Sequence, residues 1–241
     1  MRTKDRIIVA LDTDSRATAL SLVRRLKAQV GVFKIGSQLF TAEGPEIVRE
    51  IIEMGEKIFL DLKFHDIPNT VARAVSVAAG MGISMLTLHT LGGLSMLESA
   101  ARQIRDSHKA SEKPLLLGVT VLTSMSDTDL EEVGVYAEAE TQVVLLAGIA
   151  LKAGLDGVVA SPKELPRLRQ EYGPALKLVV PGIRPSGSDS HDQTRIANPA
   201  EAIQAGADYL VIGRPITASS DPSGSVQQII EMIERERVPK G

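Results

Sequence analysis

The chain has 241 residues, 44% of them hydrophobic and 24% charged, so it is long enough to bury one large core. Its 27 basic and 30 acidic residues give a net charge of -3, which offers no general attraction for nucleic acid or for an anionic membrane. Cysteine is absent, which excludes disulfides, thiolate metal sites and a thiol nucleophile. No stretch approaches ~20 consecutive apolar residues and no signal-peptide pattern is present, so we expect a cytoplasmic protein without a nucleic-acid or membrane partner.

Short apolar runs alternate with helical patterns along the chain. The first run ends in an acid and is followed by apolar positions at roughly a 3.6-residue period, and the same order recurs after the later runs. Strands are predicted at 6–12, 31–36, 57–63, 84–90, 115–122, 157–161, 176–183 and 208–213. Helices are predicted at 20–26, 45–52, 68–78, 96–104 and 143–151, from 162 onward, and at 200–205 and 226–233.

Eight such units predict an all-parallel sheet whose strands are buried on both faces. Eight is the number that closes into a (β/α)8 TIM barrel, an α/β fold, and the length suits a single domain over residues 1–241. No linker, low-complexity segment or charge block indicates a second domain. A doubly wound open sheet is the alternative fold, and it is disfavoured because no Gly-x-Gly-x-x-Gly follows the first strand.

The third run carries the strongest signal for chemistry. Asp61 and Lys63 follow its apolar part, and because side chains alternate along a strand, both should leave the strand end on the same face. Asp66 comes three residues later, and Pro68 supplies the first turn of the next helix. An ordinary ion pair explains Asp61 and Lys63 when they are considered alone, since desolvation roughly cancels the attraction within such a pair.

Polar residues at matching places on other strands argue for a function. In a barrel the C-terminal ends of the strands meet at one mouth, where the active site lies. Asp12 ends the first strand, and Lys34 lies near the end of the second. Thr123 and Ser124 follow the fifth. A charge network of this size costs more than an apolar core would, which indicates catalysis.

A second cluster follows the seventh and eighth strands, where barrels often hold a phosphate group. The motif of Gly213, Arg214 and Pro215 suits a phosphate in three ways. The backbone N–H groups at Gly213 can approach the phosphate closely, Arg214 offers a guanidinium, and Pro215 starts a helical turn. Arg184 and Gln193 lie in the long polar segment before the eighth strand, and we expect them to close on the phosphate. A plain turn with a solvated arginine explains the glycine-arginine-proline motif equally well when it is taken alone.

Two histidines and three carboxylates raise the question of a metal. We interpret His65 as a loop residue whose ring packs locally, and His89 as an interior residue with its hydrogen bonds satisfied. Both interpretations are favoured over a role in catalysis or metal binding. A divalent cation could use Asp12, Asp61 and Asp66, but the lysines of the second and third strands put positive charge among them. We therefore predict neither a metal nor a cofactor.

The segment 61–66, Asp-Leu-Lys-Phe-His-Asp, with Ile-Pro-Asn-Thr behind it, resembles the signature of the orotidine 5'-monophosphate decarboxylase family. Other segments resemble the blocks of this family in the same order across the chain, and the short form is similar to its bacterial branch. These segments are Val9-Ala-Leu-Asp12, Phe33-Lys-Ile-Gly36, Leu122-Thr-Ser124, Val180-Pro-Gly-Ile-Arg184 and Val211-Ile-Gly-Arg-Pro215.

The resemblance implies cofactor-independent conversion of orotidine 5'-monophosphate to UMP and CO2 in pyrimidine biosynthesis. It implies that Lys63 protonates C6 of the pyrimidine and that Asp61 lies against the scissile carboxylate. Lys34 and Asp66 would complete a Lys-Asp-Lys-Asp array, and Asp66 and Thr70 would come from the partner subunit of a homodimer with shared active sites. The implied substrate contacts are Asp12 and Lys34 for the ribose, Thr123 and Ser124 for the pyrimidine, Arg184, Gln193, Gly213 and Arg214 for the phosphate, and Pro181.

Two other functions stay open at this point. Mg2+-dependent sugar-phosphate decarboxylases and aldolases of the same barrel group, of the 3-keto-gulonate-phosphate decarboxylase and hexulose-phosphate synthase type, also carry Asp-x-Lys-x-x-Asp. They place a metal-ligating acid where this chain has Lys34. A non-catalytic uridylate-binding module would keep the pocket without the reaction, and the intact acid-base array argues against it.

Overall fold

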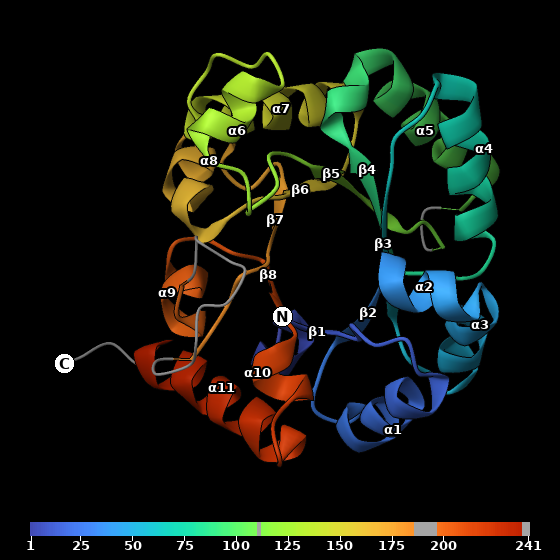
Figure 1. The fold of residues 1–241 in the computed structure, drawn as a ribbon, viewed down its shortest axis with the longest axis vertical. Coiled ribbons are helices and arrows are strands. Elements are labelled where there is room, and N and C mark those ends of the chain that lie inside the picture. Colours follow the sequence, from blue (N-terminus) through green and yellow to red (C-terminus); the bar gives the residue numbers. More distant parts are fainter. Residues whose placement is uncertain (110–111, 186–196, 238–241) are drawn as a thin grey trace.

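Eight parallel strands close into a barrel that is ringed by helices in the computed structural model of the chain, which describes residues 1–109, 112–185 and 197–237 (Figure 1). Neighbouring strands pair in chain order and β1 pairs with β8, so the sheet closes on itself. The predicted (β/α)8 barrel is confirmed, and the open-sheet alternative is wrong. The strands are β1 Ile7–Ala10, β2 Val32–Gly36, β3 Ile58–Phe64, β4 Met85–His89, β5 Leu115–Val119, β6 Gly157–Val159, β7 Lys177–Val180 and β8 Tyr209–Ile212.

Helices connect successive strands, two more follow β8 within the described residues, and together they cover the outside of the barrel (Figure 1). They are α1 Arg16–Leu26, α2 Ser37–Glu43, α3 Glu46–Glu53, α4 Pro68–Ala79, α5 Gly93–Ser107, α6 Asp127–Glu132, α7 Ala139–Ala153, α8 Leu165–Tyr172, α9 Pro199–Gln204, α10 Arg214–Thr217 and α11 Pro222–Arg237. Short 3-10 segments occur at η1 Thr3–Arg6, η2 Thr90–Gly92 and η3 Pro162–Glu164.

Two short helices occur where the sequence analysis expected none. Helix α2 precedes the helix predicted from residue 45, and α6 lies between the strand predicted at 115–122 and the helix predicted at 143–151. Helix α6 is stabilised by a capping box. The Ser126 hydroxyl accepts from the Asp129 N–H, and the Asp129 carboxylate accepts from the Ser126 N–H.

Both faces of the barrel wall are buried, because alternate residues of each strand point to opposite sides. Ile7 and Val9 pack toward the helices, whereas Ile8 and Ala10 pack inside the barrel. Lys34 pairs in register with Ala10, so its side chain starts among the inward-facing residues. The inner cluster consists of Ile8, Ala10, Val32, Phe59, Met85, Leu117, Val179 and Val211.

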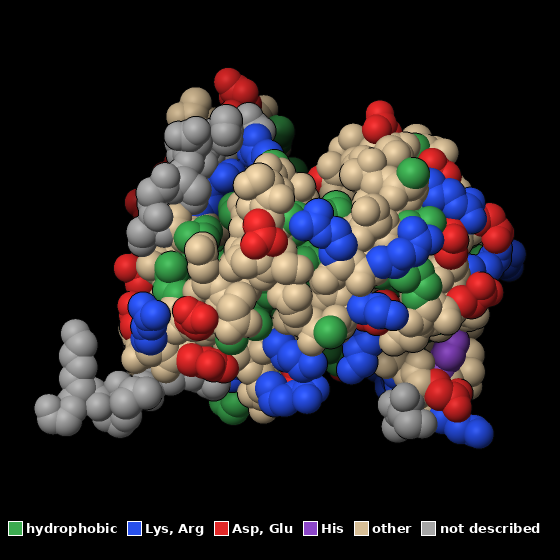
Figure 2. Space-filling model, turned by 90° about the horizontal axis from the view of Figure 1, so that it is seen from below, with side chains coloured by type: hydrophobic (Ala, Val, Ile, Leu, Met, Phe, Trp, Pro, Cys, Tyr) green, Lys and Arg blue, Asp and Glu red, His purple; other side chains and the backbone are tan. Residues whose placement is uncertain are grey.

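The surface carries both signs of charge. On the face shown in Figure 2, basic and acidic side chains both occur, with apolar side chains between them, and neither sign covers the whole face. This agrees with the near balance of 27 basic and 30 acidic residues. Within the described ranges, no helix is long and apolar enough to cross a membrane.

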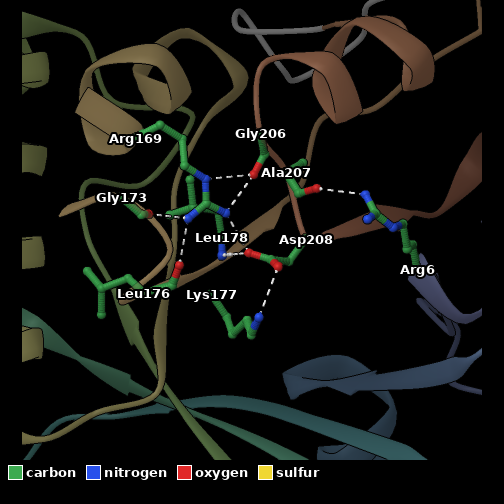
Figure 3. A network of polar contacts seen from close by, with 9 residues as sticks. All are labelled: Arg6, Arg169, Gly173, Leu176, Lys177, Leu178, Gly206, Ala207 and Asp208. Carbon is green, nitrogen blue, oxygen red and sulfur yellow. Dashed lines mark hydrogen bonds and ion pairs between the residues drawn. The ribbon is translucent and has the colours of Figure 1, made fainter. Parts of the chain in front are cut away.

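Arg169 of α8 joins the N-terminal ends of β7 and β8 through hydrogen bonds (Figure 3). Its guanidinium donates to the Gly206 carbonyl at 2.6 and 3.0 Å. It also donates to the carbonyls of Gly173 and Leu176 at 2.7 and 2.8 Å. One side chain therefore satisfies backbone carbonyls in the segments that precede β7 and β8, at the end of the barrel opposite the mouth.

The carboxylate of Asp208 completes this network. It accepts from Arg169 at 2.5 Å, from the Leu178 N–H at 2.9 Å and from Lys177 at 3.2 Å. Burial opposes the ionisation of Asp208, but these donors outweigh it and hold its pKa below the usual value. The network therefore joins α8, β7 and β8 through a charged, fully bonded carboxylate.

Replacing Arg169 with alanine should destabilise the fold and leave the chemistry at the mouth unchanged. The change removes the donors to three carbonyls and one partner of Asp208, so we expect a loss of about 2–4 kcal/mol in denaturant unfolding. Arg167→Ala, on the same helix, is the matched control, because its pair with Glu171 is solvent-exposed and contributes less than about 1 kcal/mol. Equal losses in the two variants would contradict this role of Arg169.

Candidate active site

Strand β3 departs from regular pairing where its charged residues begin. Its register against β4 shifts between Leu60 and Phe64. Lys63 has a φ of 51° and is the one non-glycine residue with positive φ among the described residues. Asp61 and Lys63 both lie at the barrel mouth, as predicted. Strand alternation explains Asp61, which follows the inward-facing Phe59 by two residues and pairs in regular register with Gly36 of β2. Lys63 lies where the backbone of β3 is irregular and strained, a feature that concentrates at functional sites.

The carboxylate of Asp61 is the centre of the polar contacts at the mouth. Lys63 Nζ donates to its two oxygens at 2.9 and 3.0 Å, and Thr87 Oγ1 donates to Oδ1 at 2.9 Å. Lys34 Nζ lies 3.6 Å from Asp61 Oδ2 and 3.1 Å from Asp12 Oδ1. Burial opposes the ionisation of Asp61, but the two lysines and the hydroxyl outweigh it and lower its pKa. Asp61 is therefore an ionised carboxylate held between two ammonium groups.

Gly36 leaves the space that the Lys34 ammonium occupies. It is paired in register with Asp61, and a Cβ at this position would lie 3.1 Å from Lys34 Nζ. Lys34 is itself buried, with 9% of the residue exposed. A larger side chain at position 36 would press the ammonium away from the carboxylates that compensate its charge.

A cavity of about 290 Å3 opens at the C-terminal ends of the strands. This volume is close to the lower bound of about 300 Å3 for small-molecule sites. Its charged and polar lining comes from strand ends that are far apart in the sequence. The predicted site residues that line it are Asp12, Lys34, Asp61, Lys63, Thr123, Pro181, Arg184, Gly213 and Arg214.

Two arginines reach this cavity from the segments after β7 and β8. Arg184 is buried, and its Nε has no hydrogen-bond partner among the described residues. Its backbone N–H donates to the Ala197 carbonyl at 3.0 Å, which fixes the segment after β7. Arg214 begins α10 directly after Gly213. A buried guanidinium donor without a partner in the wall of a cavity suits an anionic ligand.

Three predicted site residues among those described do not line this cavity. Asp66, Thr70 and Ser124 are exposed and do not line it. The Asp66 carboxylate accepts a hydrogen bond from the Ile67 N–H at 2.6 Å. Gln193 lies outside the described residues. The barrel of one chain thus brings together the Lys-Asp-Lys part of the predicted array and leaves Asp66 outside it.

The sequence analysis missed Thr87 and assigned no role to His65 and His89. Thr87 is fully buried in β4 and contacts Asp61, and its signal in the sequence was a hydroxyl within an otherwise apolar strand. The rings of His65 and His89 stack with their centroids 5.2 Å apart. His89 Nδ1 accepts from the Leu91 N–H at 3.4 Å, so the ring is hydrogen-bonded as expected, although the residue is only partly buried.

The carboxylates at the mouth are compensated by lysine. Among the described residues, no three His, Cys, Asp or Glu side chains are grouped so as to hold a metal ion. Lys34 Nζ lies between Asp12 and Asp61, where a cation bound by these two carboxylates would sit. The donor set therefore suits an internal ammonium group better than a divalent ion.

The sequence model of the orotidine 5'-phosphate decarboxylase / HUMPS family matches residues 5–229. The chain belongs to this family. It is 52% identical to the orotidine 5'-phosphate decarboxylase of Syntrophotalea carbinolica, over 95% of this chain and 94% of the relative. It is 49% identical to the enzyme of the same name from Moorella thermoacetica, over 97% of this chain and 94% of the relative.

Solved structures agree with this assignment. The crystal structure of orotidine 5'-phosphate decarboxylase from Lactobacillus acidophilus superposes with a TM-score of 0.84 at 37% identity. The superposition covers 94% of this chain and 98% of that one. The resemblance inferred from the motifs is thereby confirmed at the level of the family and of the fold.

Acid should destabilise the protein through His89. Burial, His65 and Lys63, in that order, lower the pKa of His89 below its usual value of about 6.5. The unfolded chain therefore takes up a proton on this residue more readily than the folded one, so stability is lost as the pH falls through this range. Protonation would also remove the acceptor that Leu91 uses.

The prediction is checked by following Tm from about pH 7.5 to about pH 5.5. The Tm of the wild type should fall more steeply than that of His89→Gln, which cannot take up the proton. His108→Gln, at the end of α5, is the matched control for the loss of a histidine. Parallel Tm curves for the wild type and His89→Gln would refute the role assigned to His89.

Proposed function

We propose that this chain is a carboxy-lyase that converts orotidine 5'-monophosphate to UMP and CO2 in pyrimidine biosynthesis, without a cofactor. The observation that carries the proposal is the Lys34-Asp61-Lys63 array in a cavity that two arginines also line. Relatives that bear the name of this activity are 49 to 52% identical to the chain over nearly its whole length. The same proposal takes residues 1–241 as one domain and the cytoplasm as its location.

The proposed reaction is demanding. Loss of CO2 from C6 leaves a lone pair in the plane of the ring, where the carbonyl groups cannot delocalise it. Without an electron sink, the site must lower the barrier by on the order of 20 kcal/mol. The Lys63 ammonium, fixed 2.9 Å from Asp61, is preorganised to stabilise the developing anion and then to protonate C6. The lowered pKa of Asp61 keeps a negative charge beside the substrate carboxylate, and this repulsion is relieved as neutral CO2 leaves.

The remaining proposed contacts hold the phosphate and the ribose of the substrate. Arg184 and Arg214 bind the phosphate, and the Nε of Arg184, which has no hydrogen-bond partner among the described residues, supports this assignment. Asp12 and Lys34 contact the ribose hydroxyls. Because the phosphate is remote from C6, its binding energy serves catalysis by closing the site over the ring. The other proposed substrate contacts are Thr70, Thr123, Ser124, Pro181, Gln193 and Gly213.

The rival within the family is a Mg2+-dependent sugar-phosphate decarboxylase or aldolase. Lys34 Nζ lies 3.1 Å from Asp12 and 3.6 Å from Asp61, so an ammonium group already compensates the carboxylates that a metal would need. Its charge would repel a divalent ion at this place. This contact favours a reaction that is independent of metal.

The purified protein should consume orotidine 5'-monophosphate, followed as loss of orotate absorbance, at the same rate in excess EDTA as with Mg2+. Lys63→Ala should lose about a thousand-fold or more in kcat while UMP binding is retained, because the phosphate contacts lie elsewhere. Lys57→Ala, an exposed lysine just before β3, is the matched control and should keep full activity.

Each other outcome points to a different function. Activity that disappears in EDTA and returns with Mg2+ would support the sugar-phosphate enzyme. Tight UMP binding without turnover would support the non-catalytic binding module. Near-normal kcat in Lys63→Ala would remove this lysine from the mechanism.

The proposal includes a homodimer in which Asp66 and Thr70 serve the active site of the partner. Both residues are exposed and neither lines the cavity of its own chain. Ile67, beside Asp66, is 66% exposed although it is apolar, which is expected of a residue covered by a second subunit. In a two-fold dimer each site would then combine Lys63 of one chain with Asp66 of the other.

Mixing two inactive variants tests the shared site. Heterodimers of Lys63→Ala and Asp66→Ala would carry one doubly altered site and one intact site. With random pairing about half of the dimers are mixed, so activity should return to about a quarter of the wild-type value per total site. The variants kept apart are the control, and mass spectrometry verifies that mixed dimers formed. Mixed dimers without recovered activity would mean that Asp66 serves its own chain.

A further inference from the structure

Thr87 lies beside the charged array, and the mechanism proposed above does not use it. It is the central residue of β4 and is fully buried. On one side it pairs in regular register with Leu117 of β5. On the other side the register with β3 is interrupted between Leu60 and Phe64. Thr87 therefore faces the place where β3 leaves the regular ladder.

The Thr87 hydroxyl contacts the backbone of one member of the array and the side chain of another. Its Oγ1 accepts from the Lys63 N–H at 2.9 Å and donates to Asp61 Oδ1 at 2.9 Å. A hydroxyl carries one hydrogen and two lone pairs, so both bonds form at once. The Asp61 oxygen that receives this hydrogen is also bound by Lys63 Nζ, at 2.9 Å. These bonds close a ring that includes the backbone and the ammonium of Lys63.

The Lys63 backbone needs such support. Its φ of 51° is unfavourable for a residue with a Cβ, and this conformation persists only where the surroundings hold it. Because the register shift interrupts the pairing with β4, the Thr87 hydroxyl supplies the acceptor for the Lys63 N–H at this point. Without the hydroxyl, the partly buried N–H of Lys63 and one oxygen of the partly buried Asp61 carboxylate would each lose a partner.

We propose that Thr87 is a positioning residue for the decarboxylation. Its hydroxyl locks the Asp61 carboxylate and the strained backbone of Lys63 into one geometry, so the ammonium is aligned before the substrate binds. This inference rests on the proposed function of the site. Among the described residues, the Thr87 hydroxyl bonds to the Lys63 N–H and to the Asp61 carboxylate and to none of the proposed phosphate contacts, so its loss should lower kcat and leave KM nearly unchanged.

The pH dependence should change as well. The charged groups that face Asp61 are Lys34 from β2 and Lys63 from β3, and the bond from Thr87 adds to their effect in favouring the carboxylate. Removing that bond raises the pKa of Asp61, so the acid limb of the profile of kcat/KM against pH should move to higher pH. A threonine that only filled space would not move this limb.

The experiment compares Thr87→Val, which keeps the volume and removes the hydroxyl, with Thr87→Ser, which keeps the hydroxyl. We expect Thr87→Val to lower kcat about 10- to 100-fold with KM within about 3-fold, and Thr87→Ser to stay within about 3-fold of the wild type. Thr90→Val is the matched control. Thr90 is also buried, but its hydroxyl donates to the Val119 carbonyl at 2.6 Å, so its loss should lower Tm without lowering kcat.

Thr87→Ala is used if the valine variant does not fold. It also removes the hydroxyl, its side chain is smaller than that of valine, and it is compared with Thr87→Ser in the same way. Equal kcat in the alanine and serine variants, or an unmoved acid limb, would overturn the role of Thr87. Wild-type turnover is measured first. A wild type that does not decarboxylate orotidine 5'-monophosphate would overturn the proposed function and this inference together, whereas normal turnover in the wild type and in Thr87→Val would overturn this inference alone.

Discussion

The partly buried carboxylate of Asp61 lies between the ammonium groups of Lys34 and Lys63, and the rest of the mouth depends on this contact. Without the lysines, burial would favour the neutral acid, and without the carboxylate, two cations would face each other in a partly desolvated cavity. The Asp61 carboxylate therefore stays ionised because of the lysines, and its charge compensates theirs. The barrel wall accommodates both lysines. Gly36 leaves space for the ammonium of Lys34, and Lys63 lies where β3 shifts its register against β4.

The barrel can hold this arrangement because the groups that stabilise the fold and the groups of the candidate site lie at opposite ends of its strands. At the N-terminal ends of β7 and β8, Arg169 and Asp208 satisfy one another and the nearby backbone groups (Figure 3). At the C-terminal ends, one cavity contains a buried lysine, a residue with positive φ, and an arginine whose Nε has no hydrogen-bond partner in the part of the chain that the structure describes. Strain of this kind persists where the surrounding structure over-determines it, and a wall buried on both faces does so.

The cavity has two chemically different sets of groups. One set combines the alternating lysines and carboxylates, and the other combines Arg184 and Arg214. A ligand that suits both carries an anionic group for the arginines and a reacting centre that gains negative charge near Lys63. A nucleoside monophosphate that loses CO2 meets both demands. Lys34 favours the proposed metal-independent reaction over a metal-dependent one on the same barrel, because its ammonium lies between Asp12 and Asp61.

Much of this protein follows from local patterns in the sequence. Hydrophobic periodicity determined the eight strand-helix units and hence the closed barrel, because each period depends only on residues close together in the chain. The barrel rule then brought the polar residues of the strand ends to one mouth. The capping box of Ser126 and Asp129 was equally local, and α6 could have been predicted from it.

The geometry of the site was decided by tertiary structure. The positive φ of Lys63 follows from how β3 and β4 pair, and no pattern within β3 specifies that pairing. Thr87 follows Asp61 by 26 residues, so only the closed sheet brings its hydroxyl to the carboxylate. Asp66 has the spacing of a site residue and still lies outside the cavity of its own chain. Periodicity assigns a residue to a face, whereas contacts between strands distant in the chain fix where its atoms lie.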